Sequence, residues 1–138
     1  MILDSNLYEK SIKILTDLIS FKTISGKDNG PLIDYCDDIL KKNGVSTFRV
    51  FDGNKERVNL FGTIKAKKMN GKKPLILSGH TDVVPVSKGW TTDPFLATIK
   101  GDKLFGRGSC DMKGFIACVL AYVPTLSKTN LDRDIHFS

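Results

Sequence analysis

The sequence of 138 residues is poor in cysteine and tryptophan and contains no long apolar run. Its three cysteines, Cys36, Cys110 and Cys118, are too few and too scattered for a disulfide framework or a zinc-finger pattern, so free thiols in a reducing compartment are expected. No apolar run approaches the roughly 20 residues that a membrane span needs. The first residues also lack the basic region and apolar stretch of a signal peptide. These absences predict a cytoplasmic globular protein without a membrane partner.

The charge is unbalanced toward basic residues, with 21 Lys and Arg against 15 Asp and Glu and a formal net charge of +6. Much of the excess lies between Lys65 and Lys73, around an Asn70-Gly71 pair that is typical of a tight turn between two strands. Such a cluster is either a solvated turn or a site for a polyanion. No aromatic residues alternate with these lysines and no nucleic-acid motif accompanies them, so no nucleic-acid partner is expected.

The spacing of apolar residues predicts helices that alternate with strands. One helix is expected from about residue 6 to residue 20, with Ser5 as N-cap, and a second begins near Pro31 and ends before Gly44. Strands are expected over residues 45–51, 58–66, 74–80 and 135–137, and a hairpin over 97–105 with Gly101-Asp102 as its turn. A third helix is expected over residues 112–126, with inward side chains from Phe115, Ile116, Val119, Leu120 and Val123.

This alternation indicates a layered α/β fold. The run from Pro74 to His80 is typical of a buried strand whose C-terminal end opens onto a site. The sequence stops within the apolar strand at residues 135–137, which predicts a domain that is incomplete at its C-terminus.

The first candidate site follows that strand, in Ser78-Gly-His80-Thr-Asp82. A His and an Asp two residues apart in extended backbone point to the same face. A metal-bound imidazole typically donates its second N–H to a carboxylate, and Asp82 is placed to accept that hydrogen bond from His80. The alternative is a surface histidine beside a turn aspartate, and the motif by itself does not decide between the two.

The second candidate is Gly106-Arg-Gly-Ser-Cys-Asp-Met-Lys-Gly114, where three glycines surround Asp111 at a predicted strand-to-helix junction. Glycines permit a tight backbone, and unusual backbone tends to gather at functional sites. The alternative is that Asp111 simply caps the third helix. A phosphate-binding loop fits less well, because the spacing is not that of a P-loop and an aspartate at a helix start repels an anion.

Two further features have less specific explanations. Trp90 and Phe95, in the loop between the two motifs, are either loop anchors over the sheet edge or substrate contacts. Cys110 is next to Asp111, but no second cysteine or histidine pair nearby supports a role as thiolate ligand or nucleophile.

Taken together, the two motifs resemble one enzyme family. The chain resembles the acetylornithine deacetylase and succinyl-diaminopimelate desuccinylase family of dinuclear zinc hydrolases in the order of its elements. A strand is followed by Gly79-His-Thr-Asp-Val-Val-Pro85, by a loop with Trp90-Thr-Thr-Asp-Pro-Phe95, and then by the glycine-rich motif and a helix. The resemblance runs over the whole chain. It implies a helix–sheet–helix, zinc-peptidase-like catalytic domain, of which residues 1–138 are the N-terminal part.

The resemblance also implies roles for three residues. The histidine that matches His80 binds one zinc, the aspartate that matches Asp111 bridges both metals, and the aspartate that matches Asp82 supports the histidine. A carboxylate between two divalent cations and a neutral imidazole on one of them agree with the chemistry of Zn²⁺, for which Co²⁺ can substitute. In this family the peptide after the bridging aspartate, here Asp111–Met112, is cis.

The family's remaining active-site residues do not match positions in this chain. The general base belongs to a Glu-Glu pair shortly after the strand that residues 135–137 begin, and the other metal ligands come later still. His136 lies before that pair and is not expected to be a ligand. The family's lid-like dimerisation domain would also follow Ser138, so a full-length protein is expected to be a homodimer.

Within the family, the motifs look most like those of acetylornithine deacetylases. This similarity implies hydrolysis of N2-acetyl-L-ornithine to acetate and L-ornithine, a step in arginine biosynthesis, with a small N-acyl amino acid as substrate. Succinyl-diaminopimelate desuccinylase, or another N-acyl-amino-acid deacylase or carboxypeptidase, is the alternative within the family. A binding module that retains the fold without catalysis is the alternative outside enzyme function.

Overall fold

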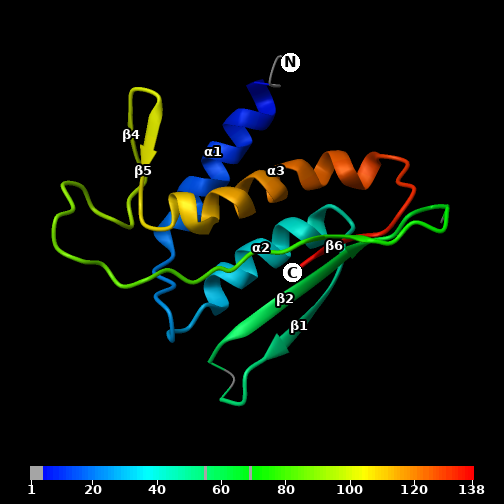
Figure 1. Cartoon of the computed structure of the whole chain (residues 1–138), viewed down its shortest axis with the longest axis horizontal. Helices are drawn as coiled ribbons and strands as arrows, with labels where there is room; N and C mark the ends of the chain where they lie inside the picture. The colour runs from blue at the N-terminus through cyan, green and yellow to red at the C-terminus, as the bar shows by residue number, and fades with distance from the viewer. Residues whose placement is uncertain (1–4, 55, 69) are drawn as a thin grey trace.

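The computed structural model describes residues 5–54, 56–68 and 70–138 and contains a four-stranded mixed sheet (Figure 1). The strand order is β1-β2-β6-β3. β1 (Ser46–Phe51) pairs antiparallel with β2 (Val58–Ile64), β2 pairs antiparallel with β6 (Ile135–Phe137), and β6 pairs parallel with β3 (Leu75–Leu77). A separate hairpin is formed by β4 (Thr98–Lys100) and β5 (Lys103–Phe105). The last strand of the described chain is therefore inserted in the middle of the sheet.

Three helices pack into one core with one face of this sheet. α2 (Gly30–Lys42) lies against β1 and β2, and α3 (Gly114–Lys128) packs against α2 and α1 (Ser5–Ser20). Alternate strand residues such as Val58, Ile64 and Phe137 are buried under these helices. Residues of opposite parity point away from the helices, and Phe48 and Ile76 among them are exposed.

The second helix and the hairpin agree with the sequence prediction in detail. Asn29 is the N-cap residue of α2, Pro31 lies in its first turn, and Gly44 follows its end with a φ of 75°, a value that favours glycine. Gly101, in the turn between β4 and β5, also has a positive φ. α1 already includes Ser5, so this residue is helical and the predicted N-cap is wrong.

Three other predictions about burial and connection are wrong. Within the part of the chain that the structure describes, β3 is an edge strand that pairs with β6 alone, and its residues Leu75 and Ile76 are exposed. The Asn70-Gly71 turn does have a positive φ at Gly71, but β6 separates the two strands that it connects. Phe115 is exposed, because the face of α3 that packs inward is formed by Ala117, Leu120, Ala121 and Val123.

One helical segment of the described chain, Ser109–Lys128, is long and apolar enough to cross a membrane by length and composition. The sequence analysis did not expect such a segment. Packing accounts for part of its apolar composition, since α3 contributes Ala117, Leu120 and Val123 to the core, whereas Phe115 and Tyr122 are exposed. The segment also contains Lys113, whose side chain is fully buried against α1.

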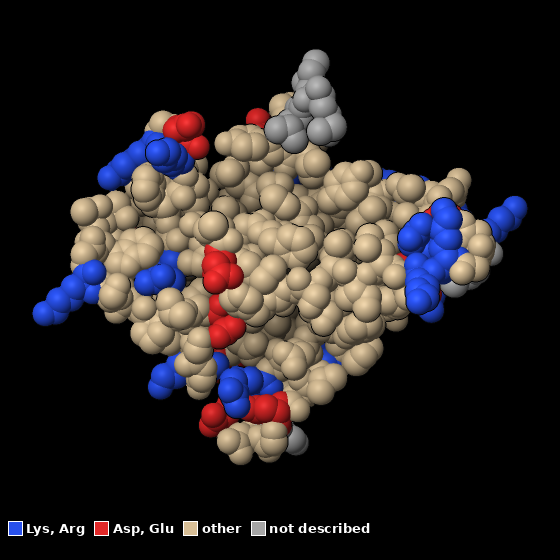
Figure 2. All heavy atoms as spheres, in the orientation of Figure 1, with Lys and Arg blue, Asp and Glu red and all other residues tan. Residues whose placement is uncertain are grey.

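Much of the basic excess lies at the edges of the face shown in Figure 2, whereas acidic and uncharged side chains occupy its middle. In the cluster from Lys65 to Lys73, Lys65 pairs with Asp134 at 2.7 Å, and Lys72 pairs with Asp132. These acidic partners neutralise part of the cluster, which favours the solvated-turn interpretation.

A buried carboxylate connects α2 to β1. Asp37 is 1% exposed and accepts hydrogen bonds from Lys41, from the Thr47 hydroxyl at 2.7 Å and from the Arg49 guanidinium at 2.6 Å. Burial by itself raises the pKa of Asp37, but the hydrogen bonds from Lys41, Thr47 and Arg49 together outweigh it and hold the pKa below its ordinary value. Arg49 also donates to Asp34 and so joins two turns of α2 to the strand.

We expect Asp37→Asn to lower the free energy of unfolding by about 1–3 kcal/mol at pH 7, because the partly buried Arg49 guanidinium loses its buried charged acceptor. The folded-state pKa of Asp37 is lowered, so its contribution is present above about pH 4 and is lost as the pH falls through the folded-state value. The difference between variant and wild type should therefore shrink in urea titrations at pH 3. Asp38→Asn, at the exposed neighbouring position, is the control and should leave the midpoint within experimental error.

Candidate metal centre

The C-terminal end of β3 presents His80 at the edge of the sheet. Hydrogen bonds from Ser138 N to the Leu77 carbonyl and from Gly79 N to the Ser138 carbonyl continue the pairing of β3 with β6 beyond the strand itself. The chain is therefore still extended where His80 leaves the sheet. This is the position that the sequence predicted for it.

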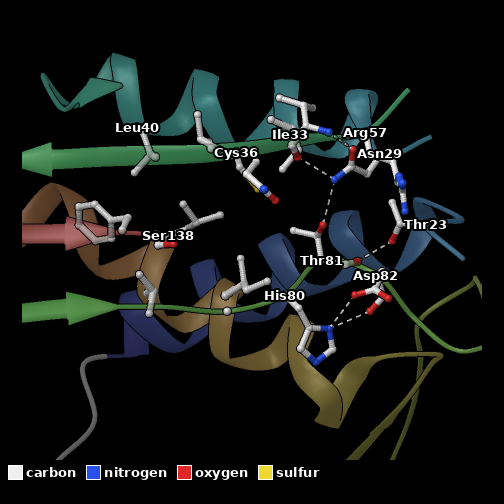
Figure 3. A pocket seen from close by; sticks show the side chains of 18 of the residues that line it. Thr23, Asn29, Ile33, Cys36, Leu40, Arg57, His80, Thr81, Asp82 and Ser138 are labelled. Carbon is white, nitrogen blue, oxygen red and sulfur yellow. Dashed lines mark hydrogen bonds and ion pairs between the residues drawn. The ribbon is translucent and has the colours of Figure 1, made fainter. Parts of the chain in front are cut away.

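The residues after His80 are held by the segment that follows α1, as Figure 3 shows for Thr23 and Thr81. The Thr23 hydroxyl donates to the Thr81 carbonyl at 2.6 Å. Val83 N donates to the Thr23 carbonyl and Ser25 N donates to the Val83 carbonyl, which makes a short parallel bridge between Ile24 and Val83. Two segments that are distant in the sequence thus form one frame around residues 81–83.

Asp111 lies in a tight turn between the β4–β5 hairpin and α3. The turn covers Ser109–Lys113, and its Asp111–Met112 peptide bond is cis, as the family resemblance predicted. Gly108 precedes it with a φ of 81°, and a Cβ on Gly114 would lie 2.4 Å from the Ser109 carbonyl oxygen, so both positions require glycine. Asp111 has non-helical backbone angles and no side-chain capping bond is made to α3. The helix-cap alternative is therefore wrong.

The two motifs meet at His80. Its Nε2 lies 3.0 Å from Oδ1 of Asp111, and its Nδ1 lies 3.1 Å from Oδ1 of Asp82. The hydrogen bond with Asp111 raises the pKa of His80, partial burial opposes that effect, and the contact with Asp82 adds to it. A hydrogen bond from the Ser25 hydroxyl holds the pKa of Asp82 below its ordinary value, although burial opposes it. One imidazole thus stands between two carboxylates, as predicted.

The donor atoms suit a divalent transition metal. Two ligands of one tetrahedral zinc at about 2.0–2.1 Å each stand roughly 3.3 Å apart, close to the observed separation of His80 Nε2 and Asp111 Oδ1. Asp82 engages Nδ1, so the Nε2 lone pair faces Asp111 whenever Nε2 carries no proton. Among the described residues, no group of three or more His, Cys, Asp or Glu side chains is arranged to hold a metal ion, so the chain offers a partial ligand set.

A cavity of about 680 Å³ adjoins the site (Figure 3). His80, Thr81 and Asp82 line part of it, and the rest is lined by apolar side chains such as Leu40 and Val119 together with polar and charged ones such as Asp52 and Arg57. Asn29 also lines the cavity and joins two of its segments, because its amide pairs with the backbone of Val58 on β2 and donates to the Thr81 hydroxyl at 3.4 Å.

Lys113 is the most deeply buried charged residue near the site, and the sequence analysis gave it no role. Its side chain is 0% exposed, and Nζ donates hydrogen bonds of 2.8 Å to the carbonyl oxygens of Leu18 and Phe21 at the C-terminal end of α1. Burial lowers the pKa of Lys113 to about 8. This contact attaches the turn that carries Asp111 to α1.

The other residues singled out in the sequence lie outside the His80–Asp111 contact. The Cζ atom of the Arg107 guanidinium lies 5.2 Å from the centre of the Trp90 ring, and Nζ of Lys22 lies 5.6 Å from the centre of the Phe95 ring. These contacts favour loop anchoring for both aromatics. Cys110 is an exposed free thiol. His136 lies on β6, where its Nδ1 is 2.9 Å from the Thr63 hydroxyl.

Comparison with known proteins gives a family. Residues 76–138, which include both motifs, match the family model described as peptidase family M20/M25/M40. The chain contains part of an M20 peptidase family domain. The family resemblance drawn from the two motifs is thereby confirmed.

Among curated M20 relatives, the chain is 42% identical over 109 residues to acetylornithine deacetylase of Myxococcus xanthus, a match that covers 77% of this chain and 28% of the relative. It is 39% identical over 127 residues to succinyl-diaminopimelate desuccinylase of Rickettsia massiliae, a match that covers 88% of this chain and 32% of the relative. The chain thus spans about a third of the length of these relatives.

A solved structure confirms the fold. An M20 family metallo-carboxypeptidase from Sulfolobus solfataricus superposes with a TM-score of 0.75 at 26% identity and covers 93% of this chain and 30% of its own. The predicted α/β class is therefore correct, and the architecture is that of M20 metallopeptidases.

We expect Lys113→Ala to lower the free energy of unfolding by about 2–4 kcal/mol, because it leaves a cavity and removes the donor from the Leu18 and Phe21 carbonyls. Urea titration followed by circular dichroism measures the loss. Lys128→Ala removes an exposed lysine from the last turn of α3 and should be close to neutral. An unchanged midpoint for Lys113→Ala would show that the buried ammonium does not stabilise the fold.

Proposed function

We propose that this chain supplies part of the active site of a metal-dependent amide hydrolase. The observation that carries the proposal is the position of His80, whose two ring nitrogens face Asp111 and Asp82 at hydrogen-bond distance. In this assignment, His80 and Asp111 are metal ligands, and Asp111 is the carboxylate shared by two zinc ions. Asp82 is the residue that orients His80. Cobalt is expected to substitute for zinc.

Each residue has a defined task in this proposal. Asp82 accepts the Nδ1–H hydrogen bond of His80, which fixes the tautomer and directs the Nε2 lone pair toward Asp111. The Asp111 carboxylate would supply negative charge to the metal pair and offset the repulsion between the cations. Within residues 1–138 its side chain is 85% exposed, so this chain leaves it open to further ligands and to substrate. When bound, the metal pair would lower the pKa of a water molecule and polarise the amide carbonyl.

The remaining parts of the proposed active site are assigned to residues outside this chain. The partial ligand set within residues 5–54, 56–68 and 70–138 supports this division. In the proposal, residues 1–138 are the N-terminal part of the catalytic domain. The general base, the other ligands and a lid-like domain that forms a homodimer belong to the rest of the full-length protein. Free cysteines agree with a cytoplasmic location.

For the substrate, we propose N2-acetyl-L-ornithine, with acetate and L-ornithine as products. The support is the acetylornithine deacetylase from Myxococcus xanthus at 42% identity and the motif from Gly108 to Phe115. The desuccinylase from Rickettsia massiliae, at 39% identity, makes N-succinyl-diaminopimelate the competing substrate. Other N-acyl amino acids are the remaining alternatives.

We expect the full-length protein to hydrolyse N2-acetyl-L-ornithine with a higher kcat/KM than N-succinyl-diaminopimelate, and to lose activity on chelation and regain it with zinc or cobalt. Asp111→Asn should reduce kcat/KM by more than about 10²-fold, because loss of a metal ligand lowers activity more than loss of a residue that hydrogen-bonds to a ligand. Asp102→Asn, on the exposed turn of the β4–β5 hairpin, is the control and should retain full activity. Metal-independent hydrolysis would refute the proposal, and substrate binding without cleavage would favour a binding module.

We expect the 138-residue chain alone to show no deacetylase activity, even in excess zinc or cobalt. A catalytic zinc usually has three protein ligands, and removal of a general base commonly lowers the rate by about 10²–10⁴-fold. Release of ornithine from N2-acetyl-L-ornithine, measured beside the full-length protein at equal concentration, checks this. Comparable rates would mean that the ligands and base all lie within this chain.

A further inference from the structure

We propose that Ser25 is a positioning residue for the metal site. Its hydroxyl holds the carboxylate of Asp82 in place, and this carboxylate orients His80. This inference rests on the metal-binding role of His80 stated above and extends it to a residue that lies in a different segment of the chain. No part of the family motifs includes Ser25.

The contact geometry assigns the two oxygens of Asp82 to different partners. Oδ1 lies 3.1 Å from His80 Nδ1, and Oδ2 accepts a hydrogen bond of 2.5 Å from the Ser25 hydroxyl. A carboxylate held at both oxygens cannot rotate about its terminal bond without breaking one of these contacts. The Ser25 hydroxyl therefore sets the plane of the Asp82 carboxylate. This carboxylate holds the imidazole at Nδ1 together with the backbone carbonyl of Asp82, which also lies 3.1 Å from Nδ1.

This restraint is needed because the residues involved are not held by packing. The side chains of His80 and Asp82 are 48% and 52% exposed, so surrounding atoms do not lock their rotamers. An exposed side chain loses conformational entropy when it is ordered. Unless other contacts have already ordered it, this loss makes the free energy of metal binding less favourable. The hydrogen bond from Ser25 orders Asp82 before any metal binds.

Ser25 is itself firmly placed. Its N–H donates to the Val83 carbonyl at 2.9 Å, and Val83 N donates to the Thr23 carbonyl at 2.8 Å. The Thr23 hydroxyl donates to the Thr81 carbonyl. The donor and its acceptor are thus on two backbone segments that are hydrogen-bonded on both sides of Asp82, which keeps the two side chains in register.

The test is metal affinity of the full-length protein, measured by competition between the apoprotein and a chromophoric chelator for Zn²⁺. Ser25→Ala should weaken the affinity of the His80 site by about tenfold, the lower end of the range for outer hydrogen-bond partners. Ser25→Thr keeps a hydroxyl and should restore most of the affinity. Because Ser25 is exposed, the urea midpoint of Ser25→Ala should stay near that of wild type, and this separates positioning from folding.

Ser20→Ala is the matched control. Ser20 is an exposed serine at the end of α1 whose hydroxyl donates to the Asp17 carbonyl at 2.7 Å, away from His80, and its loss should leave the zinc affinity unchanged. If Ser25→Ala binds zinc with wild-type affinity while His80→Ala has lost zinc affinity, the role of Ser25 is overturned and the metal site itself is not. Wild-type affinity in His80→Ala would overturn the proposed metal site itself.

Discussion

The hydrogen bonds from the buried Lys113 ammonium to the carbonyl oxygens of Leu18 and Phe21 are the constraint on which the rest of the site depends. The last carbonyls of a helix have no partners within the helix and carry partial negative charge, so a cation is favoured there. Lys113 meets this requirement for α1 from a turn that is more than 90 residues further along the chain. Asp111, two residues before Lys113, is thereby held at a fixed place relative to α1.

The same helix end also fixes the other half of the site. The segment that follows α1 pairs with residues 81–83 through the Ile24–Val83 bridge, and Ser25 reaches Asp82 from it. His80 and Asp111 come from different segments of the chain, but the end of α1 supports both of them, and their side chains meet at 3.0 Å. The sheet sets the direction in which the chain carries His80, and the end of α1 sets how far His80 lies from Asp111.

Local sequence signals predicted the elements whose boundaries are set locally. Pro31 and Gly44 delimit α2, and Gly101 fixes the β4–β5 turn, because the preferences of proline and glycine for helix ends and turns act within a few residues. The convergence of His80 and Asp111 was predicted by the family resemblance, which makes both residues metal ligands. The rule that strand ends gather functional side chains accounts only for His80, because Asp111 follows a separate hairpin. The exposure of β3 was not predictable, because an apolar run does not reveal whether a strand has one neighbour or two. Lys113 and Ser25 were missed for a related reason: their partners are set by tertiary structure, and neither residue type in its local context indicates burial or a distant carboxylate.

The sequence separations within the site also bear on how the molecule folds. Ser25 and Asp82 are 57 residues apart, His80 and Asp111 are 31 apart, and Leu18 and Lys113 are 95 apart. Contacts of this kind require the closure of long loops and form slowly compared with a hairpin such as β4–β5. The proposed ligand pair, His80 and Asp111, is therefore not assembled in a chain that has formed only its local structure. In the proposed function, a metal ion would bind only after the long-range contacts have formed, and it would stabilise the completed fold over any partly folded form.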